Sequence, residues 1–193
     1  MSRAKSKLAR LLMASLVALG LSFGAAQDTF DVALCSLGLQ FFADQGRALQ
    51  EMGRVVRPGV RVGVATVGPT PPAFRELRDV LSEHLGDHVA GFIDAVFRLD
   101  DPARLDELMS TAGLEQVATS RREIHPTVDP PAEFFWQYVL GTPLAEHLTN
   151  LDDGRRSALE RAVVERWQRF TVDGQLVLDT GLVLGTAEAP GTS

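Results

Sequence analysis

The order of apolar and polar positions predicts strands and helices that alternate along the chain. Residues 30–35 form a short apolar run typical of a buried parallel strand, and residues 60–67 alternate and are rich in Val. Between them, residues 44–56 place apolar side chains at helical spacing until Arg57-Pro58-Gly59 ends the helix. A strand, a helix and a second strand joined by short connections indicate a parallel βαβ unit.

The rest of the sequence continues this alternation. Further helices are expected at residues 73–85, 103–112, 132–140 and 153–170, and further strands at residues 115–124 and 175–184. Asp100 or Asp101 is suited to cap the helix at 103–112, because a carboxylate accepts hydrogen bonds from the free amides of a first helical turn. The predicted fold class is α/β with one domain.

Composition excludes several classes of protein. With 193 residues, 45% apolar and 23% charged, the chain has the make-up of an ordinary globular domain. Its one cysteine, Cys35, excludes an intrachain disulfide and a thiolate-rich zinc site, and no HExxH or CxxC motif is present. The formal net charge of −6 argues against sequence-independent binding to nucleic acid. We therefore expect no metal and no nucleic-acid partner.

The first 27 residues differ from the rest in charge, with Arg3, Lys5, Lys7 and Arg10 and no acidic residue. An apolar stretch, LLMASLVALGLSF, follows, and then the small residues Gly24-Ala25-Ala26. This pattern is typical of a secretory signal that would release a domain beginning at Gln27. The apolar stretch is too short for a membrane span of about 20 residues, so we expect no membrane insertion.

From Phe30 to Val62 the sequence reads FDVALCSLGLQFFADQGRALQEMGRVVRPGVRV. This run resembles class I S-adenosylmethionine-dependent methyltransferases, specifically the type 11 branch that includes quinone-biosynthesis enzymes. The shared features are the FD strand, the GLQFF loop, the ALxEMxRV helix and the RPG turn. The resemblance implies a partial Rossmann-like sheet with flanking helices, corresponding to the C-terminal half of such a domain.

The resemblance also implies boundaries. It covers residues 21–187 as a methyltransferase-like domain, with a helical substrate-covering insertion at about 126–172 and a polar tail at 188–193. Residues 1–20 stand outside it, as a signal-like segment or the product of an altered start or reading frame. The first strands and the glycine-rich GxGxG cofactor loop of the family have no counterpart in the sequence.

S-adenosylmethionine is the cofactor that the resemblance implies. In the family, the loop after the strand equivalent to residues 30–35 contacts the cofactor, which corresponds here to Leu34, Cys35, Ser36 and, less directly, Gln40. From the residues alone, Leu34 and Cys35 also suit a strand that packs into the core, and this alternative stays open. Methyl transfer needs alignment more than a fixed set of catalytic groups, so no catalytic residue is assigned.

Aromatic residues mark the implied pocket for a small-molecule methyl acceptor. Phe41 and Phe42 lie where the family begins its substrate pocket, and Trp136 and Tyr138 lie in the predicted covering helix. Such rings suit an apolar or aromatic acceptor, but they equally suit packing of the helix onto its neighbours. His125, before Pro126 at a strand end, is the histidine best placed to act as a base if the acceptor needs one.

Three hypotheses follow. The first is a cytoplasmic methyltransferase for a small molecule, represented by a truncated chain. The second is a non-catalytic methyltransferase-like fragment or subunit, which would associate with itself or with a partner through the sheet edge left open by the missing strands. The third is a secreted domain, although S-adenosylmethionine is an intracellular metabolite. The missing GxGxG loop leaves open whether the chain is an enzyme.

Overall fold

The structure is a computed structural model that describes residues 26–191. The segment at 1–20 and nearly all of the signal-like stretch lie outside the described residues. The chain forms two compact units. Within the described residues, the sheet unit comprises 26–68, 98–122 and 182–191, and the helical unit comprises Pro69–Phe97 and Glu123–Gly181. The predicted domain boundaries stay predictions.

The predicted βαβ unit is present in the sheet unit. Strand β1 (Ala33–Ser36) and strand β2 (Arg61–Val67) are parallel, and helix α2 (Gln45–Val55) connects them. The helix begins where the Asp44 carboxylate accepts a hydrogen bond from the Arg47 amide at 2.8 Å. It ends before a turn in which Gly59 takes a φ of 72°, a conformation that costs glycine little. Phe30, predicted as strand, makes only an isolated bridge to Val56.

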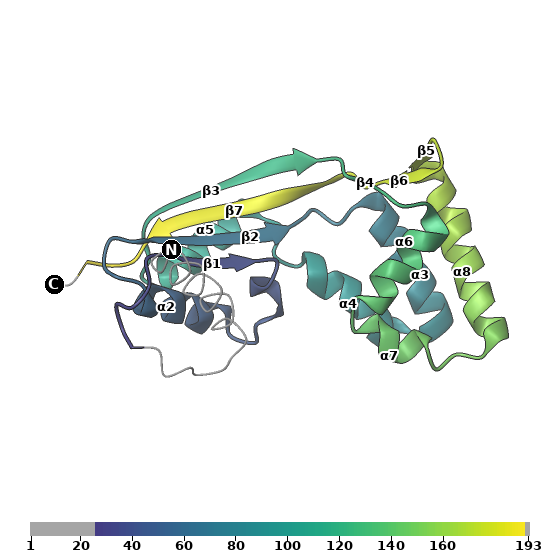
Figure 1. Cartoon of the computed structure of the whole chain (residues 1–193), viewed down its shortest axis with the longest axis horizontal. Helices are drawn as coiled ribbons and strands as arrows, with labels where there is room; N and C mark the ends of the chain where they lie inside the picture. The colour runs from purple at the N-terminus through teal and green to yellow at the C-terminus, as the bar shows by residue number, and fades with distance from the viewer. Residues whose placement is uncertain (1–25, 192–193) are drawn as a thin grey trace, which may run out of the picture. The chain divides into compact units, whose positions relative to one another are not determined.

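Strand β7 (Thr180–Glu188) completes the sheet by pairing antiparallel to β2. It lies between β2 and β3 (Glu115–Ile124), which gives the strand order β1-β2-β7-β3 (Figure 1). The predicted single strand at 175–184 is wrong, because β6 (Gln175–Val177) and β7 are separate strands. Between them the Leu178 amide donates to the carbonyl of Pro126, and β6 pairs with β4 (Thr127–Val128) in a second sheet.

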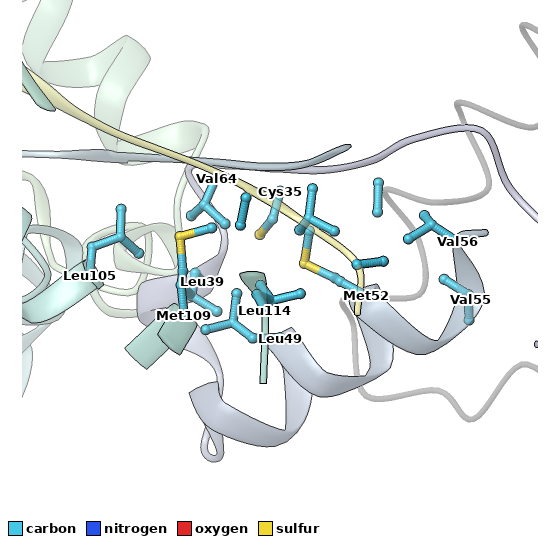
Figure 2. Packing of buried hydrophobic residues seen from close by; sticks show 14 of the residues in the cluster. Cys35, Leu39, Leu49, Met52, Val55, Val56, Val64, Leu105, Met109 and Leu114 are labelled. Carbon is cyan, nitrogen blue, oxygen red and sulfur yellow. The ribbon is translucent and has the colours of Figure 1, made fainter. Parts of the chain in front are cut away.

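One face of the four-stranded sheet is covered by α2 and by helix α5 (Pro102–Thr111), which begins at the capping residue Asp101. Figure 2 shows the sheet side chains Cys35 and Val64 facing Leu49 and Met52 of α2. These residues are almost completely buried, and burying each such side chain contributes about 1.5–3 kcal/mol. This core holds the backbone of β1 in place up to the end of the strand.

The helical unit contains five helices and a small sheet. The helices are α3 (Pro72–Leu85), α4 (Asp87–Phe97), α6 (Pro131–Leu140), α7 (Leu144–Leu148) and α8 (Asp153–Trp167), and the sheet has the order β4-β6-β5, with β5 at Thr171–Val172. Trp167 is fully buried, and its indole N–H donates to the Ala73 carbonyl at 2.7 Å. The sequence prediction missed α4 and extended α8 to Phe170, where a 3₁₀ turn follows instead.

The α/β fold class is therefore confirmed, with a mixed sheet and flanking helices. The predicted covering insertion at 126–172 falls within the second segment of the helical unit, and its covering role stays a prediction. Between residues 26 and 191, no helix combines the length and the apolar character that crossing a bilayer requires.

Candidate functional site

The candidate site is the end of β1 and the turn that follows it. Side chains alternate along this strand, so Ala33 and Cys35 face the core while Leu34, 44% exposed, and Ser36 face away from it. In a parallel sheet, ligands commonly bind at the carboxyl ends of the strands, where Ser36 stands. The strand thus presents Leu34 and Ser36 for contact and keeps Cys35 inside.

Cys35 is a core residue by its surroundings. Its side chain is 5% exposed, and it belongs to the buried cluster that includes Leu49 and Met52 (Figure 2). Burial raises the pKa of the Cys35 thiol, and the backbone amides of Gly38 and Leu39 offset this only in part. The group therefore stays a neutral thiol near neutral pH and is unsuited to act as a nucleophile.

The turn after β1 has an unusual backbone. Leu37 takes a φ of 53°, and its amide donates to the Ala65 carbonyl of β2 at 2.8 Å. A left-handed conformation costs a residue with a Cβ about 1–2 kcal/mol, so the fold must hold it in place. The consequence is that the Leu37 side chain is turned outward and is 48% exposed. The sequence carries no signal for this feature, because leucine is rare in this conformation.

Gln40 is the most informative predicted residue. It lies in the 3₁₀ turn Leu39–Phe41, it is 1% exposed, and its Oε1 has no hydrogen-bond partner. Leaving a buried polar atom unpaired costs about 1–3 kcal/mol, so such groups call for a functional explanation. A bound ligand with a hydrogen-bond donor would satisfy this oxygen. In this respect the residues fit a cofactor that carries amino groups, although contact itself stays a prediction.

Phe41 and Phe42 lie in different surroundings. Phe41 is 50% exposed, while Phe42 is partly buried against the core of the sheet unit. The Phe42 carbonyl accepts a hydrogen bond from Nη2 of Arg98 at 3.1 Å, which ties the turn to the segment before α5. Phe41 is therefore the more exposed of the two rings that follow β1.

Trp136 and Tyr138 lie in the helical unit, on different faces of α6, because residues two apart on a helix do not face the same way. Trp136 contacts α8, where its Nε1 donates to Glu160 at 2.8 Å and Arg156 lies 4.3 Å above its ring. Tyr138 instead packs edge-on against Phe74 of α3, with ring centroids 4.9 Å apart. The structure does not bring these two rings together, and their place in an acceptor pocket stays a prediction.

Two polar groups of the helical unit differ in their exposure to solvent. The Tyr138 hydroxyl is buried without a partner, and burial raises its pKa. His125 pairs with Asp179 at 2.9 Å, a partner 54 residues away that the sequence did not reveal. Both side chains of this pair are exposed, which is typical of a surface pair.

Among residues 26–191, no three His, Cys, Asp or Glu side chains are grouped to hold a metal ion.

Comparison with known proteins supports the resemblance. Residues 1–64 match the type 11 family model described as a methyltransferase domain, a range that includes the first 20 residues, which the sequence analysis left outside. A demethylmenaquinone methyltransferase of Corynebacterium kroppenstedtii is 43% identical over 56 residues, 28% of this chain and 24% of that protein. A ubiquinone/menaquinone biosynthesis C-methyltransferase of Bdellovibrio bacteriovorus is 35% identical over 69 residues, 35% of this chain and 29% of that protein.

The fold is similar to that of a proposed methyltransferase from Bacillus halodurans C-125. Its crystal structure superposes with a TM-score of 0.50 and 16% identity, over 90% of this chain and 69% of that one. The resemblance to class I S-adenosylmethionine-dependent methyltransferases of the type 11 branch is thus confirmed, and so is the fold that it implies. The chain matches only about a quarter of the length of its curated relatives, so their activities and substrates enter below as proposals.

Proposed function

We propose that this chain serves S-adenosylmethionine-dependent transfer of a methyl group to a small, apolar molecule. The family match supports the reaction class, and the quinone-related names of the two relatives support an apolar acceptor. The observation that carries the proposal is the buried, unpaired carboxamide oxygen of Gln40, shortly after the end of β1. The cofactor is an intracellular metabolite, which favours a cytoplasmic location.

The residues at the end of β1 suit the tasks of such a site. S-adenosylmethionine, when bound, supplies a methyl group made electrophilic by its sulfonium centre. Gln40 Oε1 would accept a hydrogen bond from the ligand, and the Ser36 hydroxyl would offer a second polar contact. Leu34 and Phe41, both exposed, would cover apolar parts of the ligands and exclude water. Alignment and dehydration are the main requirements of an in-line displacement.

A second candidate is a non-catalytic role through a partner chain. No GxGxG loop occurs in the sequence, and β1 is the outer strand of the four-stranded sheet among the described residues. Leu34 and Leu37 expose apolar surface at this strand. Unpaired strand edges recruit other chains, and here a second copy or another subunit would pair with β1.

Calorimetric titration of the folded chain with S-adenosylmethionine and S-adenosylhomocysteine tests the first candidate. We expect saturable binding that weakens by at least tenfold in Gln40→Leu, because the leucine cannot accept a hydrogen bond. The matched control is Gln50→Leu, an exposed glutamine on α2, which should leave the affinity unchanged. Circular dichroism of each variant establishes that the fold is kept.

The two candidates give different results. A folded sample that gives no heat with either compound contradicts cofactor binding by this chain. If the same sample sediments as a dimer, and Leu34→Lys returns it to the monomer, the role through β1 gains support. Binding that Gln40→Leu leaves intact contradicts the part assigned to Gln40 and leaves the cofactor assignment standing.

A further inference from the structure

A groove in the sheet unit is lined by none of the residues assigned to the cofactor. Its volume is about 550 Å³, and it is lined by residues 42–46 together with Arg98, Leu99, Arg104 and Leu108. A volume of this size is typical of pockets for small organic ligands, about 300–1,000 Å³. Of its lining residues, only Phe42 was assigned to a site from the sequence.

The walls of the groove are held by specific contacts. One wall is the continuous segment 42–46, which leads into α2, and the other comes from residues 98–99 and from α5. Helices α2 and α5 pack against each other in the core. Leu99 is 2% exposed, and its carbonyl accepts a hydrogen bond from the Thr66 hydroxyl at 2.6 Å. The groove is therefore formed before any ligand arrives.

The lining combines apolar side chains with two guanidinium groups. Phe42 and Leu108 are partly buried against the core, and Leu99 belongs to it. Arg98 lies across the groove, since its Nη2 donates to the Phe42 carbonyl at 3.1 Å. Arg104 pairs with Glu107 at 2.6 Å through Nη1 and remains exposed. A guanidinium has five N–H donors, so each arginine keeps donors beyond these contacts.

The acidic residue in the lining is already engaged. The Asp44 carboxylate accepts from the Arg47 amide at 2.8 Å and so caps the start of α2. Its negative charge remains, so the lining carries two cations, Arg98 and Arg104, against one anion. Planar guanidinium groups match the two oxygens of a carboxylate, and the apolar residues between them suit a hydrocarbon body.

We infer that this groove binds a small organic carboxylate with an apolar body. The carboxylate would meet Arg98 and Arg104, and the body would lie along Phe42, Leu99 and Leu108. This inference requires neither S-adenosylmethionine nor methyl transfer. Its failure is therefore distinguishable from failure of the proposed function.

Titration of the full chain with octanoate, followed by amide NMR, tests the inference. We expect saturable shifts of the amides at residues 43–46 and 98–108. Arg104→Gln should weaken binding about tenfold, because one charge-assisted contact is lost. Arg98→Gln should weaken binding at least as much, although it also releases the Phe42 carbonyl. The matched control is Arg61→Gln, an exposed arginine at the start of β2 in the same unit.

Two further probes separate the parts of the ligand. 1-Octanol has the same hydrocarbon body without the charge, and inorganic phosphate has charge without the body. Octanoate should bind more tightly than either. The inference is overturned if octanol or phosphate binds as tightly as octanoate, if Arg104→Gln binds like the parent chain, or if octanoate shifts no amide of the groove.

Discussion

The sheet unit and the helical unit bury different kinds of side chain. The sheet unit packs branched aliphatic and sulfur-containing residues such as Leu49, Met52 and Val64 between strands and α2 (Figure 2). The helical unit combines aliphatic residues such as Leu77 and Leu148 with buried rings, including Trp167 and Phe135. In the helical unit the rings of Phe135 and Trp167 meet edge-on, with centroids 6.4 Å apart, an arrangement that adds to the stabilisation from burial.

Each unit also holds one buried polar oxygen without a partner, and these are the two such atoms among the described residues: Oε1 of Gln40 and the hydroxyl of Tyr138. The Gln40 oxygen lies just after a strand, where ligands bind in parallel sheets. Tyr138 lies on α6, and the rings of Phe74 and Phe134 pack against its own ring. An unpaired buried oxygen therefore suggests a bound ligand in the sheet unit and imperfect packing in the helical unit.

The largest expected effect comes from Trp167→Ala. This side chain is fully buried and donates to the Ala73 carbonyl, so its removal should cost about 3–5 kcal/mol. Urea unfolding followed by circular dichroism should show an early transition from the helical unit. The matched control is Trp136→Ala, a partly buried ring on α6 that donates to Glu160, which should cost about 1 kcal/mol. Equal losses in the two variants would contradict a larger contribution from the fully buried ring.

Gly185→Ala tests how closely the sheet unit is packed. A Cβ at this position would lie 2.6 Å from Sδ of Met109 and 3.0 Å from Leu105, and both side chains are fully buried. We expect a loss of about 1–3 kcal/mol in the free energy of unfolding. Gly63→Ala is the control in the same sheet, since its Cβ would meet only the exposed Leu34 side chain, and it should change stability by less than about 0.5 kcal/mol.

The order and type of most elements could be predicted from the sequence, because they depend on local periodicity and capping. The strand at 115–124 and the start of α5 at Asp101 illustrate this. Helix α4 was missed, and it contains Gly91, a residue type of low helix propensity, although nothing lies within 4 Å of a Cβ there. The break between β6 and β7 depends on a hydrogen bond to Pro126, far away in sequence.

The candidate site was predictable only in part. Gln40 was identified through the resemblance, but its unpaired oxygen depends on packing that no local pattern encodes. The left-handed Leu37 contradicts the preference of its residue type. The groove beside α2 joins residues 42–46 to residues 98–108, and only the folded chain brings these together.

Replacing the two unpaired oxygens distinguishes the two units further. Tyr138→Phe removes the buried hydroxyl and should raise the free energy of unfolding by up to about 1 kcal/mol, because a desolvation cost is lost. Gln40→Leu should have a similar effect on thermal unfolding while it weakens cofactor binding. A clear loss of stability in Tyr138→Phe would mean that its hydroxyl has a partner, and the two oxygens would then no longer be alike.

The smallest effect concerns charge on the surface of the sheet unit. A hydrogen bond from Arg54 lowers the pKa of the Glu51 carboxyl. Because the folded pKa lies below the ordinary value of 4.5, the pair stabilises the fold above that pH and the contribution is lost as pH falls through the folded pKa.

Glu51→Gln should therefore cost less than about 0.5 kcal/mol near neutral pH, as expected for an exposed pair. The difference from the parent chain should shrink when unfolding is measured at progressively lower pH below 4.5. Glu115→Gln, an exposed glutamate at the start of β3, is the control and should show no such trend. A difference that grows toward acid pH would contradict a lowered pKa of the Glu51 carboxyl.

The strand order has a consequence for the way the chain is made. Strand β7 is the last strand in sequence but lies between β2 and β3. During synthesis, β2 and β3 therefore leave the ribosome with unpaired edges, and the four-stranded sheet can form only after β7 has been made. Deletion of β7 alone would remove a middle strand of the sheet, so the loss of these few residues should be as damaging as the loss of a whole unit.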